Sequence, residues 1–336
     1  MQRLLLFCGF FLILVLGAVS GLFSELQYPY YNAGEDETFV YIPPGANAAK
    51  VAELLKERGI LHTKLPFRLW LRHYGLDRSL KAGEYRFSGG ATPAEVAERL
   101  ARGDIYFRSV TIPEGLTAVE TVGLLARGGF GGRERFEAAL LRTDWIQDLN
   151  PSARDLEGYL FPETYRFGRR DDEEAVIRAM VNQFRDRMNK ILEESPLPGG
   201  WTAPRIVTLA SLIEKEVKDP SEQPVVASVL VNRLRLKMTL GCDATIIYAM
   251  KLAGTWNGNI RKSDLRIESP FNSYIHRDLP PGPICNPGER AIRAALNPEK
   301  TDYLYYVSKN DGTHQFSRDL RSHNNAVNIY QRSGRQ

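Results

Sequence analysis

Residues 205–218 read RIVTLASLIEKEVK, which is the pattern of one amphipathic helix, and the rest of the chain can be arranged around this segment. At about 100° per residue, five of its apolar side chains fall on a single face. These side chains are Ile206, Leu209, Ala210, Ile213 and Val217. Glu214 and Glu216 then lie on the two flanks of this face, while Lys215 points away from it into water.

A flank position removes a carboxylate partly from water. Partial burial raises the pKa of a carboxyl group and favours the protonated acid near neutral pH. A protonated carboxyl group is what a general acid needs to protonate a glycosidic oxygen. The alternative is that both glutamates are solvated, with Glu214 paired to Lys218 one turn later. The helix taken alone favours this second interpretation.

The composition is that of an ordinary globular protein, and a chain of 336 residues predicts about two domains. A net charge of +4, without stretches of Lys and Arg interleaved with aromatic residues, argues against a nucleic-acid partner. The sequence has no C-x-x-C or H-E-x-x-H motif, and its five histidines lack metal-ligand spacing. We therefore expect neither a metal site nor a cofactor.

The N-terminal region predicts a membrane anchor. Residues 4–23 read LLLFCGFFLILVLGAVSGLF, an uncharged apolar run long enough to cross the ~30 Å hydrocarbon core as a helix. Arg3 precedes the run and acidic residues follow it, so residues 1–3 are expected in the cytoplasm. Residues 24–38 are expected to be a linker, with everything beyond on the extracytoplasmic side of the cell membrane. A cleaved signal peptide is the alternative.

An internal repeat follows the linker. VYIPPG at residues 40–45 precedes an expected helix that ends near Gly59, and VTIPEG at residues 110–115 precedes another that ends near Gly129. Each unit therefore predicts a short strand, a Pro/Gly turn, and a helix whose C-terminus is closed by glycine.

Between the two copies, residues 83–87 alternate like a strand, and Thr92 caps a further expected helix that ends at Gly103. Strand–helix units of this size cannot bury a core singly, so we expect them to pack as one α+β module over residues 39–131. Such units resemble LysM-type glycan-binding modules. A plain spacer between the membrane and the next domain is the alternative.

Residues 132–336 are expected to form a second domain of mixed α+β structure, and the fold class predicted for the chain is α+β. Residues 279–288 contain too much Pro and Gly for a helix or a central strand, and their rigid turns would form a cleft wall. Expected helices cover residues 136–148, 174–197, 205–218, 221–234, 243–248, 289–296 and 322–331, and a hairpin joins residues 303–307 to 313–317.

Six segments in this domain carry a resemblance to a known family. They are LEGYLFPETY (156–165), ASLIEKEV (210–217), VASVLVNRL (226–234), DATIIYAM (243–250), SPFNSYIHRDLPPGPICNPG (269–288) and YLYYVSKNDGTHQFSRDLRSHN (303–324). In their order and spacing, they resemble the membrane-anchored endolytic murein transglycosylases, also called YceG-like proteins. The resemblance implies cleavage within peptidoglycan glycan strands, between N-acetylmuramic acid and N-acetylglucosamine, to leave 1,6-anhydro ends.

The resemblance also implies that Glu214, the first glutamate of the E-K-E segment, is the catalytic residue. Glu214 would protonate the leaving glycosidic oxygen and then act as a base toward the muramyl 6-hydroxyl, which attacks the anomeric carbon. Because the nucleophile belongs to the substrate, no second carboxylate has to activate water. Glu216 is the rival for this role and is otherwise a substrate-orienting or structural residue. Further candidates for substrate contact, each with a structural role as the alternative, are Asn272, Tyr274, Asn286, Tyr159 and Asp243.

The sequence also departs from the family pattern. Gly241 and Cys242 stand where the family often has Gln-Thr, and Ala244 replaces a frequent Pro. If the Gln of the family contacts glycan, binding at that subsite is altered in this chain. We predict a disulfide between Cys242 and Cys285, the two cysteines outside the apolar run, because both belong to loops expected to border one cleft in an oxidising compartment.

Two alternative functions stay open at this point. A hydrolase that leaves reducing ends would need a partner to Glu214 that activates water, with Glu157, Glu163 and Asp243 as candidates. A non-catalytic glycan-binding scaffold would bind strands without turnover. Family resemblance also implies proximity to peptidoglycan synthases, although no surface for such a partner can be recognised in the sequence.

Overall fold

The computed structural model describes residues 9–10, 13–14, 16–17, 20–21, 24, 26 and 37–332. The predicted cytoplasmic tip and most of the predicted anchor and linker lie outside these residues, so these assignments stay predictions. Among the described residues, no helix is both long enough and apolar enough to cross a membrane. The chain is mixed α+β, as expected, and it divides into two compact units, Met1–Arg108 and Ser109–Gln336, each of which we describe by itself.

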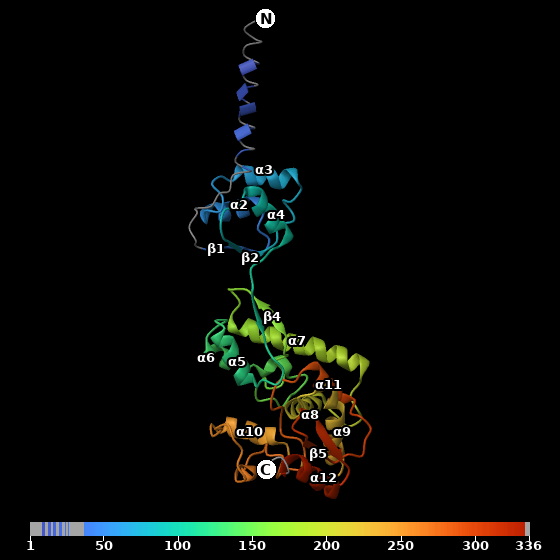
Figure 1. Ribbon diagram of the computed structural model, residues 1–336. Helices are drawn as coiled ribbons and strands as arrows, with labels where there is room; N and C mark the ends of the chain where they lie inside the picture. The colour runs from blue at the N-terminus through green and yellow to red at the C-terminus, as the bar shows by residue number, and fades with distance from the viewer. Residues whose placement is uncertain are drawn as a thin grey trace. The chain divides into compact units, whose positions relative to one another are not determined.

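The smaller unit contains one antiparallel strand pair and the helices that pack beside it (Figure 1). Its elements are β1 (Thr38–Ile42), α2 (Ala48–Glu57), α3 (Leu65–His73), β2 (Gly83–Phe87) and α4 (Pro93–Arg102). The strand register runs from Thr38 opposite Phe87 to Ile42 opposite Gly83. Every element contributes to one buried core, represented by Val40, Leu55, Phe67, Tyr85 and Leu100. The unit therefore has a hydrophobic core of its own.

Helix α4 follows its sequence signals closely. The Thr92 side chain accepts a hydrogen bond from Glu95 N at 3.2 Å, and Glu95 Oε2 accepts one from Thr92 N at 2.8 Å, which makes a capping box. Gly103 ends the helix in the left-handed conformation, with φ 78°. Helix α3 is an addition to the expected elements.

The larger unit is mostly helical, with two small sheets. Its strands are β3 (Arg108–Thr111), β4 (Thr164–Phe167), β5 (Tyr305–Ser308) and β6 (His314–Ser317). Its helices are α5 (Ala118–Arg127), α6 (Arg133–Leu140), α7 (Glu173–Glu194), α8 (Ala203–Glu216), α9 (Gln223–Arg235), α10 (Asp243–Leu252), α11 (Glu289–Leu296) and α12 (Leu320–Val327). Short turns of helix cover Thr143–Ile146, Pro220–Glu222, Asp264–Arg266 and Asn328–Arg332.

The second copy of the repeat belongs to this larger unit. Strand β3 pairs with β4, and Ile112, Val122 and Leu125 pack in the core of the larger unit. The two copies are therefore in different compact units, in contrast to the expectation of one module over residues 39–131. The apolar face of α5 packs against α6, which follows it in the chain, within the core of the larger unit.

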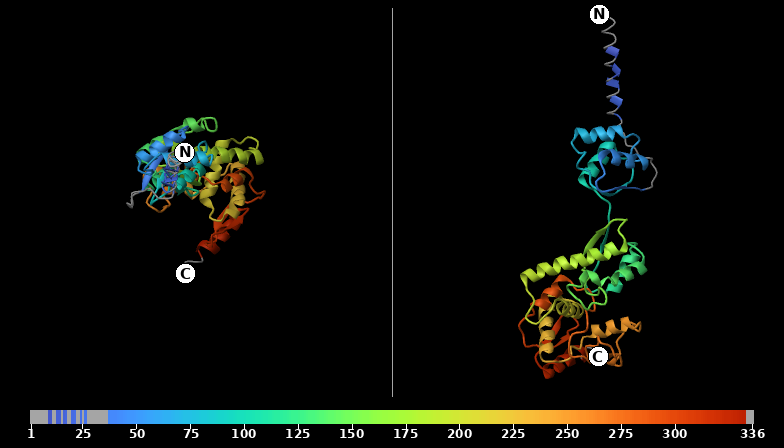
Figure 2. Two further views of the ribbon diagram at one scale, coloured as in Figure 1. Left: turned by 90° about the horizontal axis from the view of Figure 1, so that it is seen from above. Right: turned by 180° about the vertical axis from the view of Figure 1, so that it is seen from behind.

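Helix α7 connects two parts of the larger unit. Both views of the ribbon show α7 starting beside α5 and α6 and ending beside α11 (Figures 1 and 2). At that end, Arg293 NH1 of α11 donates to Glu194 Oε2 at 2.7 Å, and Asn297 Nδ2 donates to Ser195 Oγ at 2.9 Å. These contacts tie α11 and the residue that follows it to the C-terminal end of the longest helix of the unit.

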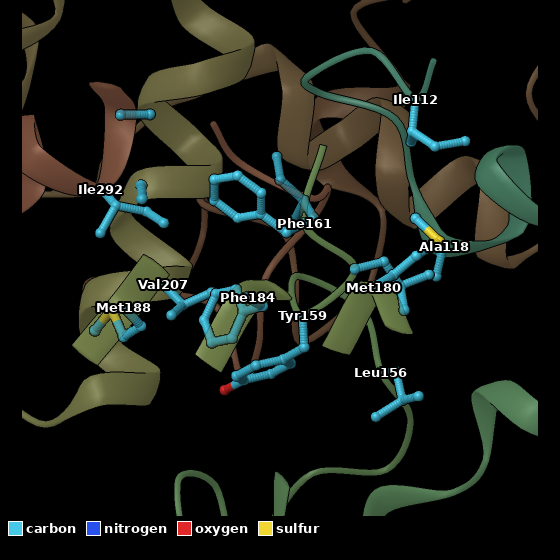
Figure 3. Close-up of a cluster of buried hydrophobic side chains, with 14 of the residues drawn as sticks. Ile112, Ala118, Leu156, Tyr159, Phe161, Met180, Phe184, Met188, Val207 and Ile292 are labelled. Atoms are coloured by element: carbon cyan, nitrogen blue, oxygen red, sulfur yellow. The ribbon is translucent and has the colours of Figure 1, made fainter. Parts of the chain in front are cut away.

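Helix α8 lies in the middle of the core. All of residues 206–213 are buried, including the hydroxyl-bearing Thr208 and Ser211. The two hydroxyls bond within the helix: Thr208 Oγ1 donates to Pro204 O at 2.9 Å, and Ser211 Oγ donates to Thr208 O at 2.7 Å. Figure 3 shows Val207 of this helix in the same cluster as Phe184 and Ile292. A buried helix of this kind holds its last turn in a fixed position.

Gly158 is required where two loops of this core meet. Its φ is +86°, and a Cβ at this position would lie 2.4 Å from Cγ of Pro283. We predict that Gly158→Ala lowers the free energy of unfolding by about 2–4 kcal/mol, through overpacking and left-handed strain. Denaturant unfolding measures this, with Gly199→Ala as the control because a Cβ there meets nothing within 4 Å. Equal stability of the two variants would contradict the packing described here.

Candidate active site

Glu214 lies in the last turn of α8, partly buried, and one of its oxygens is already occupied. Its Oε2 accepts a hydrogen bond from the backbone N–H of Gly288 at 3.1 Å. Burial raises the pKa of Glu214, and the charge of Glu114 raises it further, whereas the Gly288 N–H and Lys215 act in the opposite direction. Since Oε2 accepts a hydrogen bond, the proton of the neutral acid belongs on Oε1. The predicted flank position of Glu214 is therefore realised.

Two loops are held against Glu214 by Asn286. The Asn286 backbone accepts from Gly115 N at 2.9 Å and donates to Leu116 O at 2.8 Å. Its side chain donates to Leu116 O and accepts from Leu160 N, both at 3.0 Å. Asn286 is 1% exposed, so its hydrogen bonds join three loops rather than reaching a bound glycan. The structure therefore gives this candidate a positioning role.

Glu114 and Gly115 bring a second carboxylate to the same place. Lys215 is exposed, as predicted, but its Nζ also donates to Gly115 O at 3.1 Å. A Cβ on Gly288 would lie 1.9 Å from Glu114 Oε1, so the carboxylate of Glu114 lies directly against the Gly288 backbone. Gly288 therefore contacts Glu114 on one side and donates its N–H to Glu214.

Glu216 points to the opposite flank, toward the β5–β6 hairpin. The Tyr306 hydroxyl donates to Glu216 Oε2 at 2.8 Å. Burial raises the pKa of Glu216, and this hydrogen bond lowers it. His314 packs edge-on against the Tyr306 ring, and its Nδ1 lies 2.6 Å from Glu222 Oε2. Glu216 thus joins the end of α8 to the hairpin. This contact favours a structural role for Glu216 over the catalytic and substrate-orienting alternatives.

Three further candidates lie on the same side as Glu216. Asp243, at the start of α10, accepts a hydrogen bond from the Tyr274 hydroxyl at 2.5 Å, and of the two side chains Asp243 is exposed while Tyr274 is half-buried. Asn272 is fully buried: its Nδ2 donates to Leu265 O and Ile267 O, and its Oδ1 accepts from Tyr274 N. Asn272 therefore shapes the loop that presents Tyr274, while Asp243 and Tyr274 keep an accessible position.

Tyr159 belongs to the core. It is 1% exposed, its ring stands edge-on to Phe184 with centroids 5.0 Å apart, and its hydroxyl accepts from Asn150 Nδ2 at 3.1 Å. Figure 3 shows Tyr159 and Phe161 within the apolar cluster. Both aromatic residues thus take the core position that was the alternative to stacking on a sugar.

The two cysteines are free and buried, so the predicted disulfide is absent from the structure. Cys242 lies beside Glu216, and burial together with that carboxylate raises the pKa of its thiol. Cys285 is on the other flank of α8, where its Sγ donates to Ser211 O at 3.4 Å. The prediction is wrong because α8 separates the two loops that sequence alone assigned to one cleft edge.

Comparison with known proteins identifies the family. The YceG-like family model matches residues 40–329. The chain belongs to the YceG-like family. A protein of Bacillus subtilis (strain 168) named endolytic murein transglycosylase is 30% identical over 333 residues, covering 94% of this chain and 91% of the relative. One of the same name from Streptococcus pneumoniae serotype 2 is 29% identical, covering 80% of this chain and 54% of the relative.

A solved structure of a YceG-like protein from Listeria monocytogenes agrees with this assignment. It is 27% identical, with a TM-score of 0.57, and the match covers 87% of this chain and 100% of that one. The resemblance stated from the six sequence segments is thereby confirmed.

Sequence reasoning missed Glu114, Gly288 and Tyr306 as members of this YceG-like site. Glu114 had one available signal, since the two copies of the repeat differ there: the first reads Ile-Pro-Pro44-Gly and the second Ile-Pro-Glu114-Gly. Because the first copy forms the same turn with Pro44, the turn does not require a charged residue, and the charge of Glu114 is therefore a candidate for function. The backbone N–H of Gly288 and the hydroxyl of Tyr306 have no comparable signal.

Among the described residues, no group of His, Cys, Asp or Glu is arranged to hold a metal ion.

A third buried carboxyl group, Glu157, lies at the wall of a separate pocket of about 450 Å³. Its Oε1 accepts from Ala118 N at 2.9 Å, and its Oε2 accepts from the Tyr248 hydroxyl at 3.3 Å. Burial raises the pKa of Glu157 to about 8, and the charges of Asp155 and Glu120 act in the same direction, against these two hydrogen bonds. Glu157 therefore holds its proton in the folded protein at neutral pH.

This shift predicts a pH-dependent stability. Between its ordinary value of 4.5 and about 8, Glu157 is protonated when folded and ionised when unfolded, so its contribution to stability falls as pH rises. We expect Glu157→Gln to flatten the loss of unfolding free energy from pH 5 to 8, by up to about 1.4 kcal/mol per pH unit. Urea unfolding at each pH measures the slope, with the exposed Glu193→Gln as control. A slope equal to that of the wild type would contradict the burial of a protonated Glu157.

Proposed function

We propose that the chain is an endolytic peptidoglycan transglycosylase that cleaves MurNAc–GlcNAc bonds within nascent glycan strands and leaves 1,6-anhydro-MurNAc ends. The observation that carries this proposal is the environment of Glu214. A carboxyl group with a raised pKa, one oxygen held by a backbone N–H and the other free is prepared to donate a proton. The names of the Bacillus subtilis and Streptococcus pneumoniae relatives support the same activity.

The proposed reaction needs one group that moves protons. Glu214 Oε1 donates its proton to the glycosidic oxygen as the bond from this oxygen to the anomeric carbon breaks. The muramyl 6-hydroxyl oxygen then bonds to the same carbon, and its proton passes to the Glu214 carboxylate. Glu214 thereby regains the acid form, and no water is consumed. Because the nucleophile belongs to the bound sugar, the high effective concentration of an intramolecular attack favours this route.

The hydrolytic alternative needs a carboxylate free to activate water near Glu214. The three candidates named from the sequence are all engaged with other partners. Glu157 bonds to Ala118 N and Tyr248, Asp243 bonds to Tyr274, and Glu163 Oε2 accepts from Arg187 NH2 at 3.1 Å. These contacts argue against each of the three as the base of a hydrolase, and product chemistry distinguishes the lyase from the hydrolase.

We predict that Glu214→Gln lowers the rate of glycan cleavage by at least about 10²–10⁴-fold, because an amide cannot supply the proton. The assay incubates wild-type and variant proteins with uncross-linked nascent glycan strands and determines the new ends by mass spectrometry. Wild-type ends one water lighter than hydrolytic ends establish the lyase. Glu193→Gln should cleave normally. Reducing ends would favour the hydrolase, and binding without turnover in all variants would favour the non-catalytic scaffold.

The pH profile gives a second readout. Since Glu214 must be protonated to act, kcat should fall as pH rises through its raised pKa. The alkaline limb should therefore lie above the range of a solvated glutamate. A rate that instead rises with pH through this range would mean that Glu214 acts first as a base.

We further propose that residues 4–23 anchor the chain in the cell membrane as a single span, with the N-terminus in the cytoplasm and the catalytic unit outside, near peptidoglycan synthases. Support comes from the apolar run and from the charges that flank it. In this arrangement residues 24–38 are the linker. The catalytic machinery consists of residues 132–336 and of the second repeat copy that precedes them.

The smaller unit is proposed to be a LysM-like glycan-binding module. It has its own core, and two aromatic side chains at the C-terminal end of α3, the partly buried Trp70 and the exposed Tyr74, are available for sugar contact. Trp70 and Tyr74 lie with their ring centroids 4.3 Å apart, and Tyr74 is 55% exposed. Ring faces of this kind suit the apolar faces of pyranoses.

We predict that Tyr74→Ala weakens binding of the full chain to insoluble peptidoglycan by several-fold, with little change in stability because the side chain is exposed. Sedimentation with purified sacculi measures the bound fraction. Leu69→Ala, at an exposed apolar position of the same helix, is the matched control. Unchanged binding by Tyr74→Ala would favour the plain-spacer interpretation of this unit.

A further inference from the structure

The turn that carries Glu114 is held rigidly from three sides. Ile112 is buried, and its backbone N donates to Glu163 O at 3.0 Å. Gly115 N donates to Asn286 O at 2.9 Å, and Gly115 O accepts from Lys215 Nζ at 3.1 Å. Glu114 itself is exposed. A carboxylate that is exposed yet fixed through its own backbone can meet a ligand without a large loss of conformational entropy.

Glu114 and Glu214 converge on one residue. The backbone N–H of Gly288 donates to Glu214 Oε2 at 3.1 Å, and Glu114 Oε1 would lie 1.9 Å from a Cβ added to Gly288. Gly288 is also the N-cap of α11, where the backbone dipoles favour a negative charge. The carboxylate of Glu114 therefore occupies the position in this site that best accommodates an anion.

The two carboxyl groups have opposite environments. Glu214 is largely removed from water, whereas Glu114 is exposed at a helix N-terminus. Glycosidic cleavage passes through a transition state with positive charge on the anomeric carbon and its ring oxygen. A neutral acid beside the leaving oxygen and an anion near the charged carbon are the two groups that stabilise such a state. The structure brings both of them to one glycine, Gly288.

We propose that Glu114 is a second carboxylate of the reaction centre, whose negative charge stabilises the positive charge that develops on the muramyl anomeric carbon while Glu214 transfers the proton. This assignment rests on the proposed function and extends it. No proton or covalent bond passes through Glu114: the proton moves from Glu214 to the leaving oxygen, and the proton of the muramyl 6-hydroxyl returns to Glu214.

A second consequence concerns Glu214 itself. The charged and titratable groups that face Glu214 are Glu114, Lys215 and Cys285. Lys215 lowers the pKa of Glu214, whereas the charge of Glu114 raises it. Removing the charge of Glu114 should therefore let Glu214 ionise at a lower pH.

The test compares Glu114→Gln, Glu114→Asp and the surface control Glu193→Gln with the wild type, all in the full chain and on uncross-linked glycan strands. We expect Glu114→Gln to lower kcat by about 10²–10³-fold with a smaller change in KM, because the interaction is strongest in the transition state. Its alkaline limb should move to lower pH. Glu114→Asp keeps the charge and should recover part of the rate and the original pH limb.

A direct titration of Glu214 keeps the test independent of turnover. Carboxyl ¹³C NMR of glutamate-labelled protein, assigned with Glu214→Gln, should show a lower pKa for Glu214 in Glu114→Gln than in the wild type and in Glu193→Gln. Thermal unfolding verifies that each variant is folded. Mass spectrometry of wild-type products tests the proposed function separately from the role of Glu114.

Several results would overturn the assignment. A wild-type kcat and an unmoved alkaline limb in Glu114→Gln would exclude a charge effect. Reducing ends that disappear in Glu114→Gln would make Glu114 the base of a hydrolase instead. If the wild type does not cleave strands, the role in the transition state falls with the proposed function, and the titration alone then decides whether the two carboxyl groups are coupled.

Discussion

Burial of α8 on all sides is the constraint on which the rest of the site depends. Residues 206–213 are all inside the core, so this helix cannot rotate or slide without losing contacts along its whole surface. Its last turn then emerges between two sets of loops, with Glu214 on one flank and Glu216 on the other. The position of Glu214 is therefore fixed by the packing of the core, whereas its protonation state is set by the groups around its carboxyl group.

The sequence predicted local structure better than packing. Periodicity, the Thr92–Glu95 capping box and the turn before β6 gave elements close to those observed, because each depends on contacts within a few residues. The same periodicity suggested that α8 has a solvated face. Nothing in the pattern shows that Thr208 and Ser211 bond to carbonyl groups of their own helix, which lets that face be buried. The two repeat copies were likewise assigned to one module because sequence identity does not report which core each copy joins.

The site was predictable in part for the same reason. The place of Glu214 beside an apolar stripe indicated this residue only together with the family resemblance, whereas the amides of Asn272 and Asn286 could be assigned equally to substrate or to loop structure. Both amides are saturated by backbone groups of irregular segments, which lack the internal hydrogen bonds of helices and strands. In a wall built mostly of loops, buried polar side chains supply hydrogen-bond partners to backbone N–H and C=O groups, and this use takes priority over substrate contact. The disulfide failed as a prediction because loop proximity along a cleft cannot be inferred without knowing that α8 runs between the loops.

The contrast between Glu214 and Glu216 shows what distinguishes the glutamate that we propose as the acid from a structural one only two residues away. Both are removed from water and both have a raised pKa, with burial as the main cause. Glu216 bonds to the hydroxyl of Tyr306 in the hairpin, and burial together with the charge of Glu216 raises the pKa of this hydroxyl, so it holds its proton against transfer. Glu214 bonds only to a backbone N–H, which cannot take up or release a proton in this pH range, and its other oxygen stays available. An acid that must exchange protons with a substrate needs a partner that does not compete for them, and of the two glutamates only Glu214 meets this condition.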